Sequence, residues 1–286
     1  MDTVTRKAYA KVNLSLDVIG KRDDGYHDLR TVMQTVDLYD TLSFSLNDTG
    51  RVTLTSSSDQ VPSDDSNLIV RACNLMRDTY DITEGIDVDL VKDIPVQAGL
   101  GGGSTDAACA LRAMNDLFSL GLSAGQLCAL GAALGADVPF CIRGGTCLAE
   151  GIGEILTPLP APPACTVLIV KPQEGISTAE AYQTLDLKPV ENHPDTDALI
   201  GALQDGDLKT MCDVMGNVFE PIAFRRIPAL LDLEHTMRDY GALRAMMSGS
   251  GPAVFGIFRE EADAVKTYHL LKSRGRGVAV FVSKFL

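Results

Sequence analysis

The 286-residue sequence lacks features that would point to several common classes of protein. No run approaches the roughly 18 apolar residues of a membrane span, and residues 1–10 contain no apolar signal-peptide core, so neither membrane insertion nor export is expected. Basic residues number 25 against 38 acidic ones, which gives a formal net charge of −13. Because nucleic-acid-binding proteins usually carry a basic face, this charge argues against DNA or RNA as a partner. We therefore expect a cytoplasmic protein without a membrane or nucleic-acid partner.

The cysteines lack the spacing of a metal site or a disulfide framework. Their number is odd, no C-x-x-C pair occurs, and most lie in apolar periodic segments. This pattern is typical of reduced core thiols in a cytosolic protein. The seven cysteines are at positions 73, 109, 128, 141, 147, 165 and 212.

Chain length and composition favour two packed lobes. A chain of 286 residues is long for one hydrophobic core, and 45% apolar residues are enough for two. Residues 156–164 contain four prolines in nine positions, which is typical of a link between lobes. We place an N-terminal lobe at residues 1–157 and a C-terminal lobe at residues 158–286.

Hydrophobic periodicity predicts several strands in the first part of the chain. Residues 8–18 alternate strictly between apolar and polar side chains, which predicts a half-buried strand. An Asp-Gly pair within residues 21–28 indicates a turn. Because similar runs follow, we expect an antiparallel sheet of hairpins. The further strands are expected near residues 31–38, 41–47 and 51–56, and over 85–91.

Helical spacing of apolar residues occurs between and after these strands. Helices are expected to begin at Ser66 or Asn67 and at Ser123, which are good N-caps. Because strands and helices mix without strict alternation, the sequence favours the α+β class. Other helices are expected directly after residue 103 and over about 178–185, 195–204, 207–219 and 225–239. A strand is expected over 165–171, and the chain is expected to end in the order strand, strand, helix, strand.

A glycine-rich stretch precedes the helix that follows residue 103. Glycine occupies four of the five positions from Gly99 to Gly103. A glycine loop that opens onto a helix presents unpaired N–H groups and the positive end of the helix dipole, which suits phosphate. The stretch matches neither the Walker A pattern nor G-x-G-x-x-G, so the positive side chain must come from elsewhere. Ser104, Thr105 and Asp106 are expected to cap the helix or support its first turn.

Three other stretches contain candidate site residues. Lys11 and Asn13 are two residues apart on the polar side of the first strand, so both can address one ligand, the alternative being a solvent-facing surface. Asp137, in "GADVPF", is either a partly desolvated, paired carboxylate or a turn cap. Gly249 and Ser250, in "MSGSGPAVF", belong either to a loop whose backbone approaches a ligand or to a tight turn.

Together with the glycine loop, these stretches resemble the three motifs of the GHMP kinase superfamily in order and spacing. The resemblance implies a two-lobed α+β fold, with a ribosomal-protein-like α/β lobe followed by a ferredoxin-like α+β lobe. It also implies ATP- and Mg²⁺-dependent phosphorylation of the 2-hydroxyl of 4-diphosphocytidyl-2-C-methyl-D-erythritol, in the non-mevalonate isoprenoid pathway. The segments that carry it are "AYAKVNLSLDVIGKRDDGYHDL", "SNLIVRAC", "IPVQAGLGGGSTDAA", "LGADVPF", "AEGIGEIL" and "SGSGPAVF".

The resemblance further implies the roles of individual residues. Asp137 matches the catalytic aspartate that orients or deprotonates the hydroxyl, and Lys11 matches its cationic neighbour. Tyr26 matches a ring that stacks on cytosine, His27 a group that recognises the base edge, and Tyr182 a second ring. The ATP-binding positions are Asn67, Lys92, Pro95, Ala98, Gly99, Leu100, Gly101, Gly102, Gly103, Ser104 and Thr105. The substrate-binding positions are Asn13, Tyr26, His27, Asp137, Thr178, Tyr182, Gly249 and Ser250.

Some of these positions have simpler interpretations, and two other functions stay open. Asn67 also suits a helix cap, and Lys92 a surface charge. Asp106 stands where several relatives have a neutral residue, and it is expected to stabilise the helix dipole or to contact magnesium through water. A GHMP kinase for homoserine or mevalonate would have no use for Tyr26 and His27. A non-catalytic nucleotide-binding or RNA-associated module is disfavoured by the net charge of −13. The sequence assigns no oligomeric state and no magnesium ligands.

Overall fold

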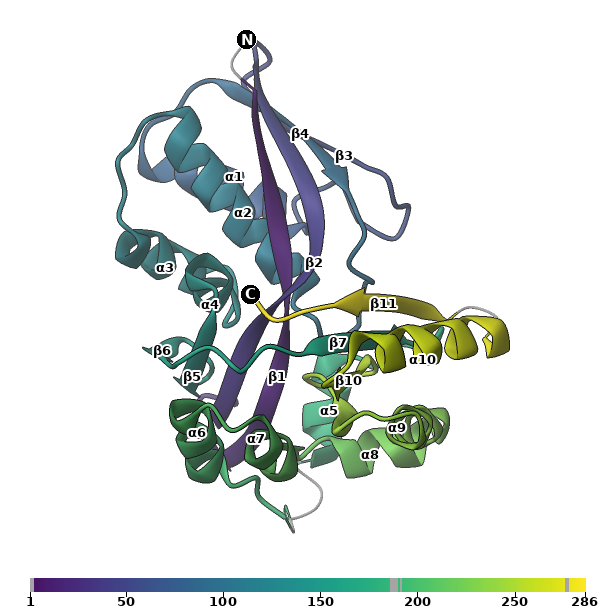
Figure 1. Cartoon of the computed structure of the whole chain (residues 1–286). Coiled ribbons are helices and arrows are strands. Elements are labelled where there is room, and N and C mark those ends of the chain that lie inside the picture. Colours follow the sequence, from purple (N-terminus) through teal and green to yellow (C-terminus); the bar gives the residue numbers. More distant parts are fainter. Residues whose placement is uncertain (1–2, 186–189, 191, 276–277) are drawn as a thin grey trace. The chain divides into compact units, whose positions relative to one another are not determined.

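The computed structural model describes residues 3–185, 190, 192–275 and 278–286 (Figure 1). Contacts between Cα atoms group the chain into two units. Unit 1 comprises Met1–Ala10, Leu38–Val96 and Gly101–Gly144, and unit 2 comprises Lys11–Asp37, Gln97–Leu100 and Gly145–Leu286. A grouping by contacts need not follow one cut in the chain, because long strands contribute residues to both units. The lobe boundary between residues 157 and 158 stays a prediction.

The first sheet is mixed rather than a set of antiparallel hairpins. Its order is β3-β4-β2-β1-β8, with β5 paired to β2 and β6 to β5. β3 and β4 are parallel, which corrects the prediction, because the helix between them makes the crossover that parallel strands need. The strands are β1 (Val4–Lys21), β2 (His27–Asn47), β3 (Val52–Ser56), β4 (Gly85–Val91), β5 (Thr146–Gly151), β6 (Ile155–Pro158) and β8 (Gly216–Asn217).

The two strands expected near 31–38 and 41–47 are one continuous strand, β2. The alternation of buried side chains passes through Leu38, Asp40 and Leu42 without a break. Asp40 is fully buried although it is charged. A carboxylate at a buried position breaks the apolar pattern in the sequence but not the strand.

Unit 1 has its own hydrophobic core, to which the helices after β3 and β4 contribute. Phe44, Ile69 and Met114 are among its fully buried side chains. The expected N-caps are confirmed: Asn67 accepts from the N–H of Ile69, and Ser123 forms a capping box with Gln126. The helices are α1 (Leu68–Thr79), α2 (Gly102–Leu117), α3 (Ala124–Ala132) and α4 (Val138–Arg143).

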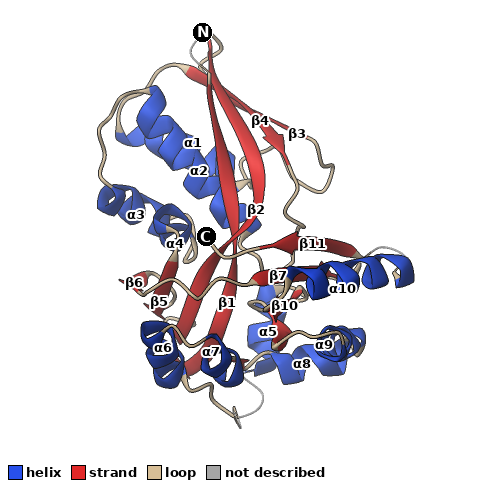
Figure 2. Cartoon of the chain, in the orientation of Figure 1, coloured by secondary structure: helices blue, strands red, loops and turns tan. Residues whose placement is uncertain are grey.

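Unit 2 contains an antiparallel sheet of order β11-β7-β10-β9, and helices α9 and α10 pack against it. Figure 2 shows its helices and strands in separate colours. Phe219, Leu230 and Phe258 are among the fully buried residues of its core. The strands are β7 (Thr166–Lys171), β9 (Arg244–Met247), β10 (Val254–Phe258) and β11 (Ala279–Ser283). The helices are α5 (Thr178–Leu185), α6 (Thr196–Asp205), α7 (Leu208–Val214), α8 (Glu220–Arg226), α9 (Ala229–Asp239) and α10 (Glu261–Arg274).

Two of the expected helices in unit 2 are shorter than predicted. Two helices, α8 and α9, replace the single helix expected over 225–239. They are separated at Pro228, because proline lacks the N–H needed inside a helix. The helix expected over 207–219 ends at Val214, since Gly216 and Asn217 pair with β1. The expected strand over 165–171 and the final order of strand, strand, helix, strand are confirmed.

The middle of β1 is buried on both sides, so the prediction of a half-buried strand is wrong there. Lys11, Asn13, Ser15 and Asp17, on its polar side, are each at most 5% exposed. Hydrogen-bond partners cover this side: Thr31 from β2, Thr196 from the start of α6, and His193. A row of buried polar groups in this position needs specific partners, which makes it a candidate functional feature.

Several of the cysteines are core thiols, as expected. Cys73, Cys109 and Cys212 are buried thiols, and burial raises the pKa of each to about 12. Among the described residues, none of the helices combines the length and the apolar character that crossing a bilayer requires.

Candidate functional site

The glycine loop leads into α2 without a side-chain cap. Gly101 holds the N-cap position in the left-handed region, at φ 70°, and this N-cap makes no side-chain hydrogen bond. The expected capping by Ser104, Thr105 and Asp106 is therefore wrong. The Thr105 hydroxyl instead donates to the carbonyl oxygen of Tyr9 at 2.7 Å. A helix start without a side-chain cap leaves its N–H groups to a ligand or to water.

In unit 2, the first half of the glycine loop packs against the small-residue loop before β10. The Ser248 hydroxyl donates to the carbonyl oxygen of Gly99 at 3.0 Å, and the Ala253 N–H donates to that of Ala98 at 3.1 Å. A Cβ at Gly99 would lie 2.1 Å from the Ser248 carbonyl oxygen, so only glycine allows this approach. The two motifs are far apart in the sequence, and backbone contact joins them.

Lys11 and Asn13 belong to the same group of segments. The N–H of Lys11 donates to the carbonyl oxygen of Leu100 at 3.0 Å. A Cβ at Gly249 would lie 3.5 Å from Oδ1 of Asn13. Unit 2 thus brings together predicted site residues from β1, from the glycine loop and from the loop before β10. The solvent-facing alternative for Lys11 and Asn13 is wrong, since they are 5% and 3% exposed.

The positions predicted to bind the substrate make two contacts with one another in unit 2. The rings of His27 and Tyr182 have centroids 4.9 Å apart, and Tyr182 packs edge-on against Phe219 at 4.8 Å. The hydroxyls of Thr178 and Ser250 are 3.0 Å apart. Tyr26 is 60% exposed, so its ring is open to a flat partner.

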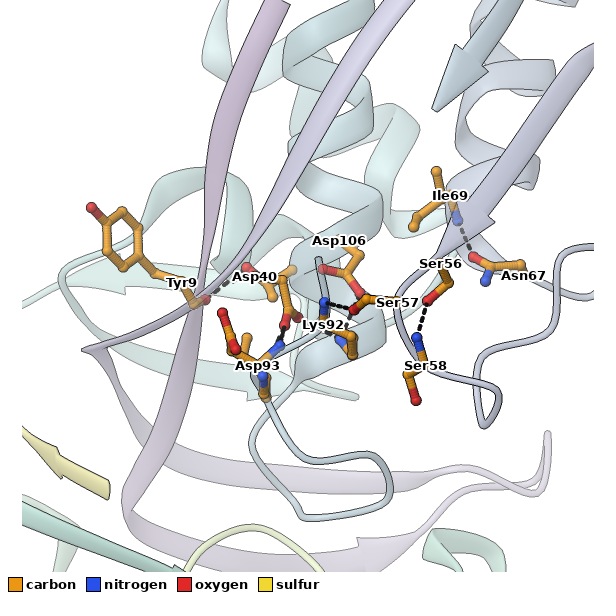
Figure 3. Close-up of polar contacts among 12 residues, drawn as sticks. Tyr9, Asp40, Ser56, Ser57, Ser58, Asn67, Ile69, Lys92, Asp93 and Asp106 are labelled. Carbon is orange, nitrogen blue, oxygen red and sulfur yellow. Dashed lines mark hydrogen bonds and ion pairs between the residues drawn. The ribbon is translucent and has the colours of Figure 1, made fainter. Parts of the chain in front are cut away.

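Lys92 lies in a buried cluster of charges in unit 1 (Figure 3). Its ammonium group donates to Asp40 from β2 and, at 2.7 Å, to Asp106 from α2. The side chain of Lys92 is only 6% exposed, so the surface-charge alternative is wrong. The other oxygen of Asp40 accepts from the backbone N–H groups of Asp93 at 2.7 Å and Ile94 at 2.8 Å. The cluster therefore fixes both the lysine and the backbone that enters the glycine loop.

The charges of this cluster compensate one another. Burial lowers the pKa of Lys92, but the carboxylates of Asp106 and Asp40 outweigh this effect and leave it raised. Burial raises the pKa of Asp106 to about 7, while Lys92 opposes the shift. An ion pair with Lys92, rather than dipole stabilisation, is thus the principal contact of Asp106. Asp40 was not predicted as a site residue. The signal that could have found it is an acidic residue at a position where the alternation of the strand calls for a buried side chain.

Asn67 and Asp137 occupy helix starts in unit 1. Asn67 caps α1, with Oδ1 accepting from Ile69 N–H at 2.8 Å and Nδ2 donating to the Pro62 carbonyl oxygen at 2.7 Å. Asp137 is the N-cap residue of α4, yet its side chain makes no capping hydrogen bond. The helix-cap alternative is therefore confirmed for Asn67, whereas the turn-cap alternative for Asp137 stays a prediction. Contacts of either residue with a ligand stay predictions.

The described residues form no group of three or more histidine, cysteine or acidic side chains that could hold a metal ion. Magnesium commonly binds through one or two carboxylates together with substrate phosphates and water. Oδ1 of Asp106 is buried and has no hydrogen-bond partner in the described part of the chain. This single carboxylate oxygen beside the start of α2 fits a cation whose other ligands come from phosphate and water.

Comparisons with known proteins identify the family. The model of the GHMP kinases N terminal domain matches residues 67–145, and that of the GHMP kinases C terminal matches residues 199–276. A 4-diphosphocytidyl-2-C-methyl-D-erythritol kinase of Caldicellulosiruptor saccharolyticus is 46% identical, over 93% of this chain and 92% of that protein. One of the same name from Lachnoclostridium phytofermentans is 42% identical, over 100% and 98%.

The chain belongs to this family of GHMP kinases. It is also similar to the crystal structure of a 4-(cytidine 5'-diphospho)-2C-methyl-D-erythritol kinase, with a TM-score of 0.83, 32% identity and 99% of each chain covered. A homoserine kinase from Cytophaga hutchinsonii gives a TM-score of 0.79 at 23% identity, over 99% of this chain and 95% of that one. The predicted α+β fold of the GHMP kinases is confirmed.

Proposed function

We propose that this kinase transfers the γ-phosphate of ATP to the 2-hydroxyl of 4-diphosphocytidyl-2-C-methyl-D-erythritol, a step of the non-mevalonate isoprenoid pathway. The observation that carries the proposal is the convergence in unit 2 of Lys11, Asn13, Gly99 and Gly249, in a chain of this family. We further propose a cytoplasmic enzyme whose partner is a small molecule with a cytidine diphosphate group.

Phosphate binding is assigned to the start of α2. The backbone from Gly99 to Ser104 offers N–H groups at the positive end of the helix dipole, whereas the Thr105 N–H donates to the Gly101 carbonyl oxygen. Pro95, Ala98, Leu100, Gly102, Gly103 and Ser104 complete the proposed ATP-binding stretch, together with Asn67 and Lys92. Two carboxylates already compensate the charge of Lys92. We assign the cation that faces the transferred phosphate to Lys11, whose backbone N–H donates to the Leu100 carbonyl oxygen in the glycine loop.

The chemistry is assigned to Lys11 and Asp137. The oxygen of the 2-hydroxyl forms a bond to the γ-phosphorus, the bond from that phosphorus to the β,γ-bridging oxygen breaks, and ADP leaves. Asp137 orients the hydroxyl and accepts its proton, while Lys11 stabilises the negative charge on the transferred group. Magnesium, when bound with ATP, neutralises phosphate charge, and Asp106 is the carboxylate that fits it.

Recognition of the cytosine is assigned to aromatic and polar side chains of unit 2. Tyr26 offers an exposed ring for stacking, and Tyr182 offers a second ring held against Phe219. His27 is expected to hydrogen-bond the base edge, a type of contact that discriminates strongly between bases. Thr178, Ser250, Gly249 and Asn13 are proposed as polar contacts to the remainder of the substrate.

An assay of ADP release from ATP and Mg²⁺ tests the proposal against its rivals. The cytidyl alcohol, homoserine and mevalonate are supplied separately, and the phosphorylated product is identified by mass. We expect turnover of the cytidyl alcohol alone. Turnover of homoserine or mevalonate without it would move the protein to another GHMP kinase activity. Salt-dependent RNA binding without kinase activity would support the non-catalytic alternative.

A further inference from the structure

Thr31, in β2, belongs to none of the motifs, yet it holds the end of a buried hydrogen-bond chain in unit 2. Its side-chain oxygen is 2.5 Å from the carbonyl oxygen of Ser15 and 2.8 Å from Nδ2 of Asn13. Oδ1 of Asn13 is in turn 2.9 Å from Nζ of Lys11. Lys11, Asn13 and Thr31 are 5%, 3% and 2% exposed, so little water reaches the chain.

The hydrogen-bonding capacity of each group sets the direction of this chain. A threonine hydroxyl has one proton, and the Ser15 carbonyl can only accept, so the Thr31 proton is committed to Ser15. The Thr31 oxygen must then accept from its other neighbour, Asn13. Only the NH₂ end of the amide can donate, which places the carbonyl end toward the ammonium of Lys11. Successive bonds of one direction also strengthen one another.

We propose that Thr31 is a positioning residue for the kinase reaction: it fixes the orientation of the Asn13 amide, and the amide oxygen then holds the ammonium group of Lys11. The proposal rests on the proposed function, in which Lys11 faces the transferred phosphate. Without the hydroxyl, the Asn13 NH₂ group loses its acceptor on β2, and that side no longer holds the amide in this orientation. In the reversed orientation its NH₂ group would face the ammonium, and two donors cannot bond to each other.

The backbone around Thr31 does not depend on its hydroxyl. The N–H of Val32 donates to the side-chain oxygen of Ser15 at 3.2 Å, and Thr31 pairs with Ala149 in the ladder between β2 and β5. Valine has nearly the shape of threonine, so Thr31→Val removes the hydrogen bonds and keeps the packing. Thr31→Ser keeps the hydroxyl and removes a methyl group.

A matched control lies in the same unit. Thr146, in β5, is 5% exposed, and its hydroxyl donates to Oε1 of Gln34 at 2.5 Å. Thr146→Val therefore removes a buried threonine hydrogen bond that is separate from the Lys11 chain. The Thr146→Val variant therefore measures how far the loss of one buried threonine hydrogen bond affects the enzyme through stability alone.

The experiment measures kcat, KM for ATP, KM for the cytidyl alcohol and Tm for the wild type and the three variants. We expect kcat to fall about 10-fold in Thr31→Val with both KM values within about 2-fold, because a misplaced group lowers kcat rather than binding. Thr31→Ser should stay within about 2-fold of the wild type, and Thr146→Val should keep its kcat although its Tm falls. If Thr31→Val does not fold, Thr31→Ala takes its place.

Three results would overturn the proposal: a wild-type kcat in Thr31→Val, a Thr31→Ser variant as slow as Thr31→Val, or an equal loss in Thr146→Val. A wild-type enzyme that phosphorylates none of the alcohols would instead overturn the proposed function. Thr31 can then be tested without activity, by crystal structures of the wild type and Thr31→Val. We expect Nζ of Lys11 to leave Oδ1 of Asn13 in the variant, and an unchanged distance between them would contradict the proposal.

Discussion

Two lysines, one in each unit, are buried to nearly the same degree but in different surroundings. Lys11 is 5% exposed, and the Lys92 side chain is 6% exposed. Lys92 lies between the carboxylates of Asp40 and Asp106, whereas Lys11 donates to the neutral amide of Asn13. A buried ammonium needs partners in either case, because isolated charge is costly away from water. Burial alone therefore does not separate a lysine that stabilises the fold from one assigned to chemistry.

Replacing Lys11 should give the largest effect and should appear in catalysis. Lys11→Met keeps most of the side-chain volume and removes the charge. We expect kcat for the cytidyl alcohol to fall by about 10³-fold, the size typical of losing a cation that stabilises a transferring phosphoryl group. The assay is ADP release under saturating substrates, with circular dichroism as a control for folding. A variant that retained wild-type kcat would end the catalytic assignment.

Replacing Lys92 should lower stability more than catalysis. Lys92→Met leaves Asp40 and Asp106 buried without their cation, and breaking a buried pair costs about 3 kcal/mol. The measurement is the free energy of unfolding in urea.

Adding Asp106→Asn to Lys92→Met removes one of the two abandoned charges, so it should recover part of the loss. If KM for ATP rose strongly while stability stayed unchanged, the ATP-binding role predicted for Lys92 would prevail over the structural one.

Tyr26 is assigned to recognition of the base, whereas Lys11 in the same unit is assigned to chemistry. Its ring is exposed, so Tyr26→Ala should leave the fold intact. A stacked base contact is worth about 1–3 kcal/mol, so KM for the cytidyl alcohol should rise about 10- to 100-fold. KM for ATP should hardly move. An effect on ATP instead would show that the base site has been placed wrongly.

The smallest expected effect concerns Glu234, a buried carboxyl group that is neutralised by a proton rather than by a lysine. Burial, together with the nearby charge of Glu220, raises the pKa of Glu234 to about 9, although Arg244 and Arg238 oppose the shift. Glu220 itself accepts from the N–H of Met247 at 2.9 Å, in the strand before the small-residue loop. The folded protein therefore keeps a proton on Glu234 that the unfolded chain releases above its ordinary pKa.

The stability that this proton contributes is complete below the ordinary pKa of glutamate and is lost as pH rises toward 9. Glu234→Gln stays neutral at every pH. Its free energy of unfolding should therefore fall less than that of the wild type between pH 6 and 7, by about 1 kcal/mol. Urea denaturation at several pH values measures this difference. Parallel curves for the two proteins would show that Glu234 does not hold the proton.

Local patterns predicted the elements that depend on neighbouring residues. The strand over 85–91 and the helix over 178–185 have the predicted bounds, and Asn67 and Ser123 cap the predicted helices. Caps and periodicity act within one or two turns, so the sequence contains the whole signal. The parallel pairing of β3 with β4 has no such local signal, and the expected antiparallel sheet of hairpins was wrong there.

The sequence by itself determined the α+β class, the order of most elements, and the motif positions from Lys11 to Ser250, because these follow from periodicity and short motifs. Only the tertiary structure decided that Lys92 is compensated by Asp40 and Asp106, and that Thr31 orients Asn13. The physical reason is distance along the chain: 52 residues separate Asp40 from Lys92, and 18 separate Asn13 from Thr31. A hydrogen bond between such residues exists only once strands and helices have packed, so no local pattern encodes it.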